Sequence, residues 1–282
     1  MQKTTSRVLA AIFIMAFCLG SIPSALAASP EQHLKVGVVG DPQNWDPIDT
    51  YRLDWSAIAT SVFEGLVERD LNAEIKPGLA TSWEINQGEK RIRFHLRKGV
   101  KFHSGHDFKA DSVKYTFDRL LAPESKSPQK GNYAAIKEVK IIDDYTVDFL
   151  LNEIDAVLIV KLSGYAGVIV PKAYIEEKGD AHFNDHPVGT GPFKMTQYVP
   201  DQTVALERFD DHWKQPLPAL DKVTFRVIPE ASTRLAELQT HTIDISNKVE
   251  INQVSAVQKS PQVDVVKADT PSVYALRFDV LR

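Results

Sequence analysis

Two histidines offer the first sign of possible chemistry. His103 and His106 stand three residues apart in a polar segment that ends in Asp107. Two imidazoles and a carboxylate are ligands that zinc and nickel accept. A polar turn before a helix explains the same residues more simply, because no further cluster of ligands accompanies them and no cysteine lies nearby. We therefore predict a structural turn, and no metal or other cofactor.

Two acidic pairs could in principle share a proton and serve acid–base catalysis: Asp143-Asp144 and Asp210-Asp211. Each pair falls between predicted strands, so we interpret all four carboxylates as turn residues in contact with water. The sequence contains no G-x-S-x-G, no H-E-x-x-H, no phosphate-binding P-loop and no dinucleotide fingerprint. It therefore gives no indication of an enzyme.

A glycine-rich run, Gly189 to Phe193, could be mistaken for a phosphate-binding loop. Pro192 removes one of the amide donors that such a loop needs. We interpret the run as a tight bend that lets two strands pack closely.

Three large aromatic residues, Trp45, Tyr51 and Trp55, cluster after the first predicted strand. They lie in a loop rich in proline and aspartate and at the start of a helix. Loops at strand ends are where α/β proteins hold their ligands. We therefore predict that at least one of these rings contacts a ligand.

Short strands and helices alternate along the chain and predict a mixed α/β fold. In the segment 91–97, Ile92, Phe94 and Leu96 alternate with basic residues and should face a core. In the helix 231–239, Leu235 and Leu238 should point inward. Strands are predicted at 33–39, 91–97, 146–151, 194–198, 203–208, 223–228, 263–267 and 273–280, and helices at 56–66, 111–121, 156–162, 171–177 and 231–239.

The first 27 residues have the features of a cleaved secretory signal peptide. A basic start is followed by an apolar run, 8–19, and by the A-x-A site at Ala25 to Ala27. The run is shorter than the roughly 20 residues of a membrane span. The only cysteine, Cys18, follows Phe17, where a lipid-anchored protein would have a small residue. We expect a soluble periplasmic product of 255 residues that begins at Ala28 and has no cysteine.

The charge of this mature chain excludes one class of partner. Without Lys3 and Arg7, 31 basic residues face 37 acidic ones, a net charge of about −6. Binding to phosphate backbones needs a basic stripe. We therefore expect no nucleic acid partner.

Seven motifs then occur in one order along almost the whole mature chain. They are N-W-D-P at 44–47, F-E-G-L-V at 63–67, P-G-L-A-T-S-W at 77–83, F-H-L-R-K-G-V-K-F-H at 94–103, V-G-T-G-P-F at 188–193, L-D-K-V at 220–223 and I-D-I at 243–245. Because it has these motifs in this order, the chain resembles the peptide/nickel class of extracellular solute-binding proteins, the dipeptide- and oligopeptide-binding type. Each motif is weak by itself, but seven in order are specific.

The resemblance implies a monomeric two-lobed binding protein with its ligand between the lobes. The first lobe would have the type II periplasmic-binding-protein fold, a mixed sheet with helices that carries an inserted α+β subdomain. Residues 28–49 and 176–270 would form the core of this lobe, residues 50–175 the insert, and residues 271–282 the start of the second lobe. The last predicted strand runs to Arg282 with no turn signal, so we expect a chain cut before most of that lobe.

The resemblance also implies ligand contacts from the first lobe near Tyr51 and Trp55, near Tyr133, and near Tyr165. With Trp45, these form the predicted ligand-binding set. Aromatic walls suit varied peptides because they give contact area without requiring one particular side chain.

The chain departs from the family pattern in three places. Lys109 stands where a capping threonine is usual, and residues 240–242 replace a usual Gly-Glu. From the resemblance we also expect most of the second lobe, which would hold the charged ends of a peptide, to be missing.

The leading hypothesis is therefore a peptide-binding component of an ABC importer that delivers its ligand to permease subunits in the inner membrane. A nickel or metal-chelate binding protein of the same family is the first alternative, favoured slightly by His103 and His106. A secreted hydrolase would need a constellation of groups that the sequence does not contain. A truncated remnant without transport function is the last alternative.

Overall fold

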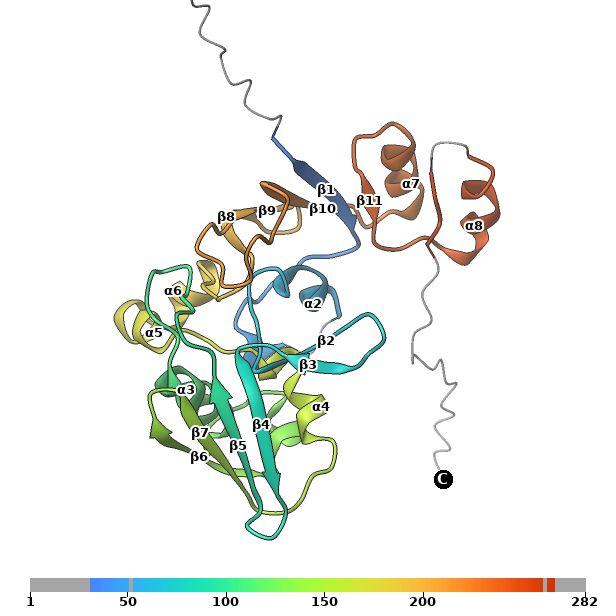
Figure 1. Ribbon diagram of the computed structural model, residues 1–282. Helices are drawn as coiled ribbons and strands as arrows, with labels where there is room; N and C mark the ends of the chain where they lie inside the picture. The colour runs from blue at the N-terminus through green and yellow to red at the C-terminus, as the bar shows by residue number, and fades with distance from the viewer. Residues whose placement is uncertain (1–30, 51–52, 261–262, 267–282) are drawn as a thin grey trace, which may run out of the picture. The chain divides into compact units, whose positions relative to one another are not determined.

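Two sheets built from different parts of the chain carry the fold (Figure 1). The computed structural model describes residues 31–50, 53–260 and 263–266. The predicted signal peptide, Tyr51, the predicted strand 273–280 and the segment 271–282 lie outside the described residues. Among the helices within the described ranges, none has the length and apolar character needed to cross a membrane.

The first sheet has five strands in the order β11-β1-β10-β9-β8. Strand β1 runs parallel to its neighbours β10 and β11, whereas β9 runs antiparallel to β10 and β8. The sheet is therefore mixed, as predicted. Its strands are β1 (His33–Val38), β8 (Phe193–Val199), β9 (Thr203–Arg208), β10 (Lys222–Val227) and β11 (Ile245–Ser246).

The second sheet is antiparallel, in the order β4-β5-β7-β6. The alternation in β5 is confirmed, because Ile92, Phe94 and Leu96 are buried. Helix α3 packs on β6 and β7, and its Phe117 ring meets Phe149 at 4.9 Å. The elements are β4 (Ala80–Asn86), β5 (Arg91–Leu96), β6 (Ile136–Asp143), β7 (Thr146–Leu151) and α3 (Ala110–Leu121).

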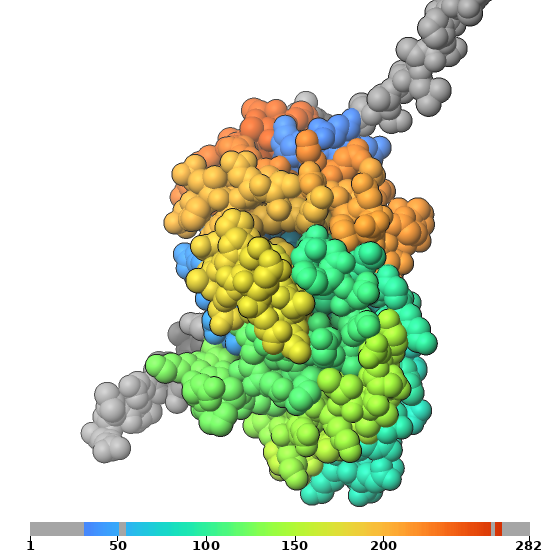
Figure 2. All heavy atoms as spheres, turned by 90° about the vertical axis from the view of Figure 1, so that its left-hand side faces the viewer, coloured from blue at the N-terminus to red at the C-terminus, as the bar shows by residue number. Residues whose placement is uncertain are grey.

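Shorter elements join and flank these sheets. Helices α5 and α6 contact each other, and α5 contacts α3. Figure 2 shows α5 and α6 in yellow on the side of the molecule that lies at the left in Figure 1. The helices are α2 (Leu53–Ala59), α4 (Leu158–Leu162), α5 (Lys172–Lys178), α6 (Asp180–Asp185), α7 (Ala231–Gln239) and α8 (Ile251–Val257); the 3₁₀ turns are η1 (Pro47–Asp49), η2 (Lys130–Tyr133) and η3 (Tyr165–Gly167); a hairpin joins β2 (Val67–Arg69) to β3 (Ile75–Pro77).

The predicted helix 56–66 is wrong beyond Ala59, where α2 ends. Val62, Phe63 and Leu66 are nevertheless buried, so their spacing marked burial rather than helix. The carbonyl groups of Ser61 and Val62 accept hydrogen bonds from the glycine bend, and that of Glu64 accepts one from Ile169. These long-range bonds replace the helical ones, which is how tertiary contacts override local propensity.

Two further predictions fail near the C-terminal end of the described chain. Residues 263–266 of the predicted strand 263–267 form no strand. In α7, Leu235 and Leu238 are only half-buried, and the buried side chain is Arg234. Its guanidinium donates to the carbonyl groups of Ile228 and Pro229, each at 2.7 Å, so backbone acceptors replace the expected apolar contact.

The two local departures from the family pattern have structural consequences. Lys109 is the N-cap of α3 and makes no capping hydrogen bond; its ammonium pairs instead with Asp144 at 2.9 Å. His241 follows the end of α7 with a φ of 56°, a left-handed conformation that glycine adopts more readily.

Candidate functional site

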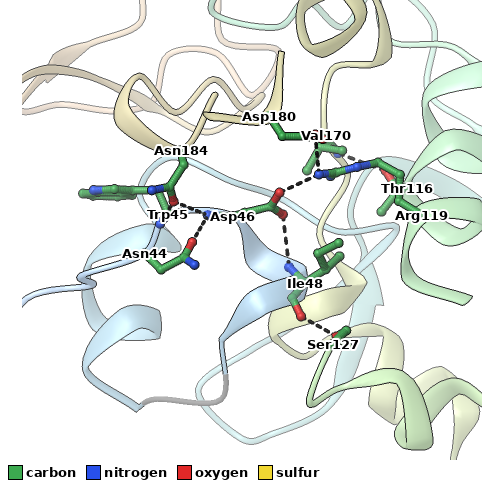
Figure 3. Close-up of polar contacts among 10 residues, drawn as sticks. All are labelled: Asn44, Trp45, Asp46, Ile48, Thr116, Arg119, Ser127, Val170, Asp180 and Asn184. Carbon is green, nitrogen blue, oxygen red and sulfur yellow. Dashed lines mark hydrogen bonds and ion pairs between the residues drawn. The ribbon is translucent and has the colours of Figure 1, made fainter. Parts of the chain in front are cut away.

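Side chains from distant segments hold the loop that follows β1. Asp41 is buried, and its carboxylate accepts hydrogen bonds from the amide of Asp201 at 2.7 Å and from the hydroxyl of Tyr198 at 3.0 Å. Asn184 of α6 accepts hydrogen bonds from the amides of Trp45 and Asp46 (Figure 3). The loop is therefore fixed at its first half by the end of β8 and by α6.

Asp46, within the same loop, is the centre of a group of ion pairs (Figure 3). It caps η1 by accepting from the amide of Ile48. Its other oxygen accepts from Arg119 of α3 at 2.6 Å, and Arg119 also pairs with Asp180 at 2.7 Å. Loss of hydration acts to lower the pKa of Arg119, but the two carboxylates outweigh it and raise that pKa. The guanidinium thus ties the loop to α3 and α6.

The segment before η2 holds the second half of the loop. The hydroxyl of Ser127 donates to the carbonyl of Ile48. The side-chain amide of Gln129 donates to the carbonyl of Thr50 at 2.7 Å. Ser127 and Gln129 are both buried, so these bonds are shielded from water. The loop 41–50 is consequently a fixed surface rather than a free connection.

An aromatic group that we call the Trp55 cluster, made of Trp55, Phe63 and Tyr165, lies next to this loop. Trp55 stacks on Phe63 with ring centres 5.8 Å apart and meets the ring of Tyr165 edge to face at 5.9 Å. The turns η1 and η3 contact each other, so Tyr165 of η3 lies beside the loop. Phe183 of α6 packs on Phe63 from another direction.

Tyr133 supports the turn that carries Tyr165. Its hydroxyl donates to the carbonyl of Lys161 at 2.7 Å, near the end of α4, and burial raises its pKa. Between α4 and η3 the chain folds back so closely that a Cβ on Gly167 would lie 2.2 Å from the carbonyl oxygen of Leu162. Only glycine fits that approach.

The structure thus brings together three of the predicted site residues. Trp55 and Tyr165 are in ring contact, and Tyr133 joins them through the turn after α4. Trp45 lies apart, edge-on to Tyr198 at 5.6 Å. Tyr51 lies outside the described residues.

Exposure separates these residues. Trp45 and Trp55 are 0% exposed and Tyr133 is 2% exposed, whereas Tyr165 keeps part of its surface open. The indole N–H groups of Trp45 and Trp55 are buried without a partner among the described residues. Ligand contact by all five residues stays a prediction, and exposure favours Tyr165 for direct contact.

Sequence reasoning missed a buried polar group that we call the Glu64 network: Glu64, Thr190, His212 and Trp213. The Glu64 carboxylate accepts from the hydroxyl of Thr190 at 2.9 Å and from the indole of Trp213 at 2.8 Å, and it lies 3.0 Å from Nε2 of His212. The only signal was that Glu64 and Thr190 belong to two of the seven motifs.

The glycine bend and His103 form one unit. The bend packs against the segment after α2, not between two strands as predicted, because a Cβ on Gly189 would lie 2.0 Å from the carbonyl oxygen of Val62. His103 contacts the backbone of Gly189 and Gly191 through its two ring nitrogens. Its imidazole therefore serves the fold, which confirms the structural interpretation.

The other candidate chemical groups also have structural partners. His106 bonds to the hydroxyl of Ser104, and among the described residues no three His, Cys, Asp or Glu side chains are grouped to hold a metal ion. Asp143 accepts from the amide of Tyr145 in the turn between β6 and β7, and its neighbour Asp144 pairs with Lys109. Residues 210–211 lie in a turn after β9. Asp144, Asp210 and Asp211 are turn residues, as predicted, whereas Asp143 is the last residue of β6.

Comparisons with known proteins give a consistent result. Residues 74–282 match the model of the bacterial extracellular solute-binding proteins, family 5 Middle. The chain is 28% identical over 255 residues to the glutathione-binding protein GsiB of Pectobacterium atrosepticum, covering 89% of this chain and 49% of the relative. It is 31% identical over 251 residues to heme-binding protein A of Haemophilus influenzae, covering 80% and 45%.

Among solved structures, the periplasmic binding protein DppA of Helicobacter pylori in complex with the peptide STSA matches with a TM-score of 0.75 and 30% identity, over 81% of this chain and 49% of its own. The chain thus spans about half the length of the relatives that it matches.

Proposed function

The chain belongs to family 5 of the bacterial extracellular solute-binding proteins, and on that premise we propose that it captures short peptides in the periplasm for an ABC importer. The proposal includes delivery to permease subunits in the inner membrane, action as a monomer and secretion through a signal peptide cleaved after Ala27. GsiB, which is glutathione-binding by name, and DppA, which was solved with a tetrapeptide, support a peptide as the ligand class.

One observation carries the site proposal: Tyr165 is the partly exposed member of the Trp55 cluster and stands beside the loop 41–50. A phenol ring offers a flat apolar surface and one hydroxyl, which suits peptides of varied sequence. Trp55 and Tyr133 lie behind it and fix its position. We propose that Tyr165 contacts the ligand and that Trp45, Tyr51, Trp55 and Tyr133 complete or support this wall.

The proposed division of the chain follows the sheets. The strands of the five-stranded sheet come from 33–38 and 193–246, and those of the four-stranded sheet from 80–151. This supports a first-lobe core of residues 28–49 and 176–270 with residues 50–175 as an insert. The start of a second lobe at residue 271 is part of the same proposal.

The test is calorimetric titration with glutathione, the tetrapeptide STSA and a dipeptide panel. Both the 282-residue chain and the product of its gene read past the Arg282 codon should be titrated. Saturable one-to-one binding of a peptide to either product is the expected result. A protein that binds none of these peptides contradicts the proposal.

A metal chelate or heme is the second candidate ligand. The 31% identity to heme-binding protein A favours heme, and the metal chelate is the alternative that the sequence left open. Titration of the same samples with heme and with nickel–histidine separates the candidates, because peptide and heme differ in size, charge and visible absorption. Binding of heme or nickel–histidine alone would replace the peptide proposal.

A further inference from the structure

Glu64 is a largely buried carboxylate whose partners come from two distant segments. Its side chain is 15% exposed and Thr190 is fully buried, as is nearly all of His212. Three donor groups, on Thr190, His212 and Trp213, converge on two carboxylate oxygens. Burying a carboxylate is costly unless such bonds compensate. An apolar residue would fill the same volume without that cost, so the carboxylate needs another explanation.

The backbone around Glu64 is bonded to the segment that carries Tyr165. The carbonyl of Glu64 accepts from the amide of Ile169 at 2.9 Å, and Gly65 forms a β-bridge with Val168. Both partners follow η3 within four residues of Tyr165. On its other side Glu64 follows Phe63, the ring on which Trp55 stacks. Glu64 therefore connects Phe63, which stacks on Trp55, with the segment that carries Tyr165.

We infer that Glu64 is a positioning residue for ligand binding: by anchoring residues 63–65 to Thr190 and His212, it sets how Trp55 and Tyr165 meet. This inference rests on the proposed function of Tyr165 as a ligand contact. A preorganised wall loses less free energy on binding than one that must be ordered. Weakening the anchor should therefore lower affinity without removing any group that touches the ligand.

Glutamine is the informative substitution at this position. Glu64→Gln keeps the length and shape of the side chain but leaves one oxygen to accept hydrogen bonds where two accepted before. Glu64 and His212 also line a pocket of about 620 Å³, so the side chain at position 64 is not enclosed on every side. Glu68→Gln is the matched control, because Glu68 lies four residues further along and its side chain is 42% exposed.

The test reads the ring arrangement directly and affinity separately. The protein is labelled with 5-fluorotryptophan, and its four tryptophan resonances are assigned by single Trp→Phe variants. We expect Glu64→Gln to shift the ¹⁹F resonances of Trp55 and Trp213 and to leave that of Trp83 in place. Affinity for glutathione and for STSA should fall about tenfold. Glu68→Gln should leave the Trp55 resonance and both affinities unchanged; the Trp213 resonance is not a control readout, because Glu68 pairs with Lys214 at 3.0 Å and the Lys214 ammonium lies 5.8 Å from the centre of the Trp213 ring.

Each result decides the inference. An unchanged Trp55 resonance in folded Glu64→Gln overturns it, and so does a shifted resonance with unchanged affinity. If Glu64→Gln does not fold, Thr190→Val removes a single donor and should shift the Trp55 resonance in the same direction by less; no shift overturns the inference. If the unaltered protein binds none of the titrated peptides, including the dipeptide panel, the proposed function fails, and the Trp55 resonance alone decides whether Glu64 positions the rings.

Discussion

The imidazole of His103 donates from Nε2 to the carbonyl oxygen of Gly191 at 2.9 Å. A carbonyl oxygen only accepts, so Nε2 carries the proton. The second ring nitrogen, Nδ1, lies 3.3 Å from the amide N–H of Gly189 and accepts from it. The backbone therefore selects one neutral tautomer. Protonation of Nδ1 would place two donors against each other.

This geometry predicts a pH dependence of stability. Loss of hydration lowers the pKa of His103 from 6.5 to about 4. Between these values the unfolded chain binds a proton that the folded chain does not, so the free energy of unfolding should fall as pH drops from about 6.5 to 4. The loss from this group is roughly 3 kcal/mol at most.

Urea unfolding at pH 7, 6, 5 and 4 checks this prediction. His103→Asn should be less stable at pH 7 but show a flatter dependence on pH. His241→Asn is the control, because His241 is exposed and asparagine tolerates its left-handed backbone. If the free energy of unfolding changed with pH in parallel for His103→Asn and the unaltered protein, the assigned tautomer would be contradicted.

The contact of Gly189 with Val62 predicts a large effect of a single methyl group. Gly189→Ala would place Cβ 2.0 Å from a carbonyl oxygen that cannot retreat, because the amide of Gly191 is bonded to it. We expect a loss of about 2–4 kcal/mol in the free energy of unfolding. Gly131→Ala is the matched control, since nothing lies within 4 Å of its Cβ position. Equal stability of the two variants would show that the bend can move.

The sequence pattern predicted those strands that have one buried apolar face and one exposed polar face. In β5, Ile92 and Phe94 face the core while Arg91 and Arg93 face outward, so alternation identified the strand. The strand β6 was missed because bulges interrupt its register between Ile136 and Glu138 and again near its end. In β4 the alternation is lost, because Ile85 is 56% exposed. Local patterns fail where the pairing itself is irregular.

The candidate site was predictable only in part, for a related reason. Large aromatic residues in loops identified Trp55, and the family resemblance identified Tyr165, but neither gave their contact. Glu64 could not be found this way, because its bonds to Thr190, His212 and Trp213 span 126, 148 and 149 residues. Propensity and periodicity describe near neighbours, whereas this network exists only after the fold has formed.

Asp148 predicts a second pH dependence of the same sign, in a more acidic range. Paired hydrogen bonds from Arg93, at 2.7 and 2.8 Å, hold the pKa of Asp148 below its usual 3.8. A lowered folded pKa stabilises the fold above the unfolded value, and that stabilisation is lost as pH falls through the folded value. Asp148→Asn should therefore cost roughly 2 kcal/mol at pH 7.

Urea unfolding at pH 7, 5 and 3.5 compares Asp148→Asn with the unaltered protein. The difference between their free energies of unfolding should stay constant from pH 7 to 5 and begin to narrow only below about pH 4. Asp118→Asn is the control, because Asp118 pairs with Lys114 on the exposed side of α3 and should change stability by less than about 0.5 kcal/mol. A gap that narrows already between pH 7 and 5 would assign the effect to another group.

Tyr165 and Trp55 should separate binding from stability, because the first is partly exposed and the second is enclosed. Tyr165→Ala should weaken peptide binding at least tenfold and lower the melting temperature little. Trp55→Ala should cost about 3–5 kcal/mol of unfolding free energy, since it empties a buried ring site. Tyr174→Ala on α5 is the control for a half-buried tyrosine outside the cluster. Calorimetric titration with glutathione and thermal unfolding of the same samples measure both quantities. A stable Trp55→Ala protein with lost binding would reverse the assignment and make Trp55 the direct contact.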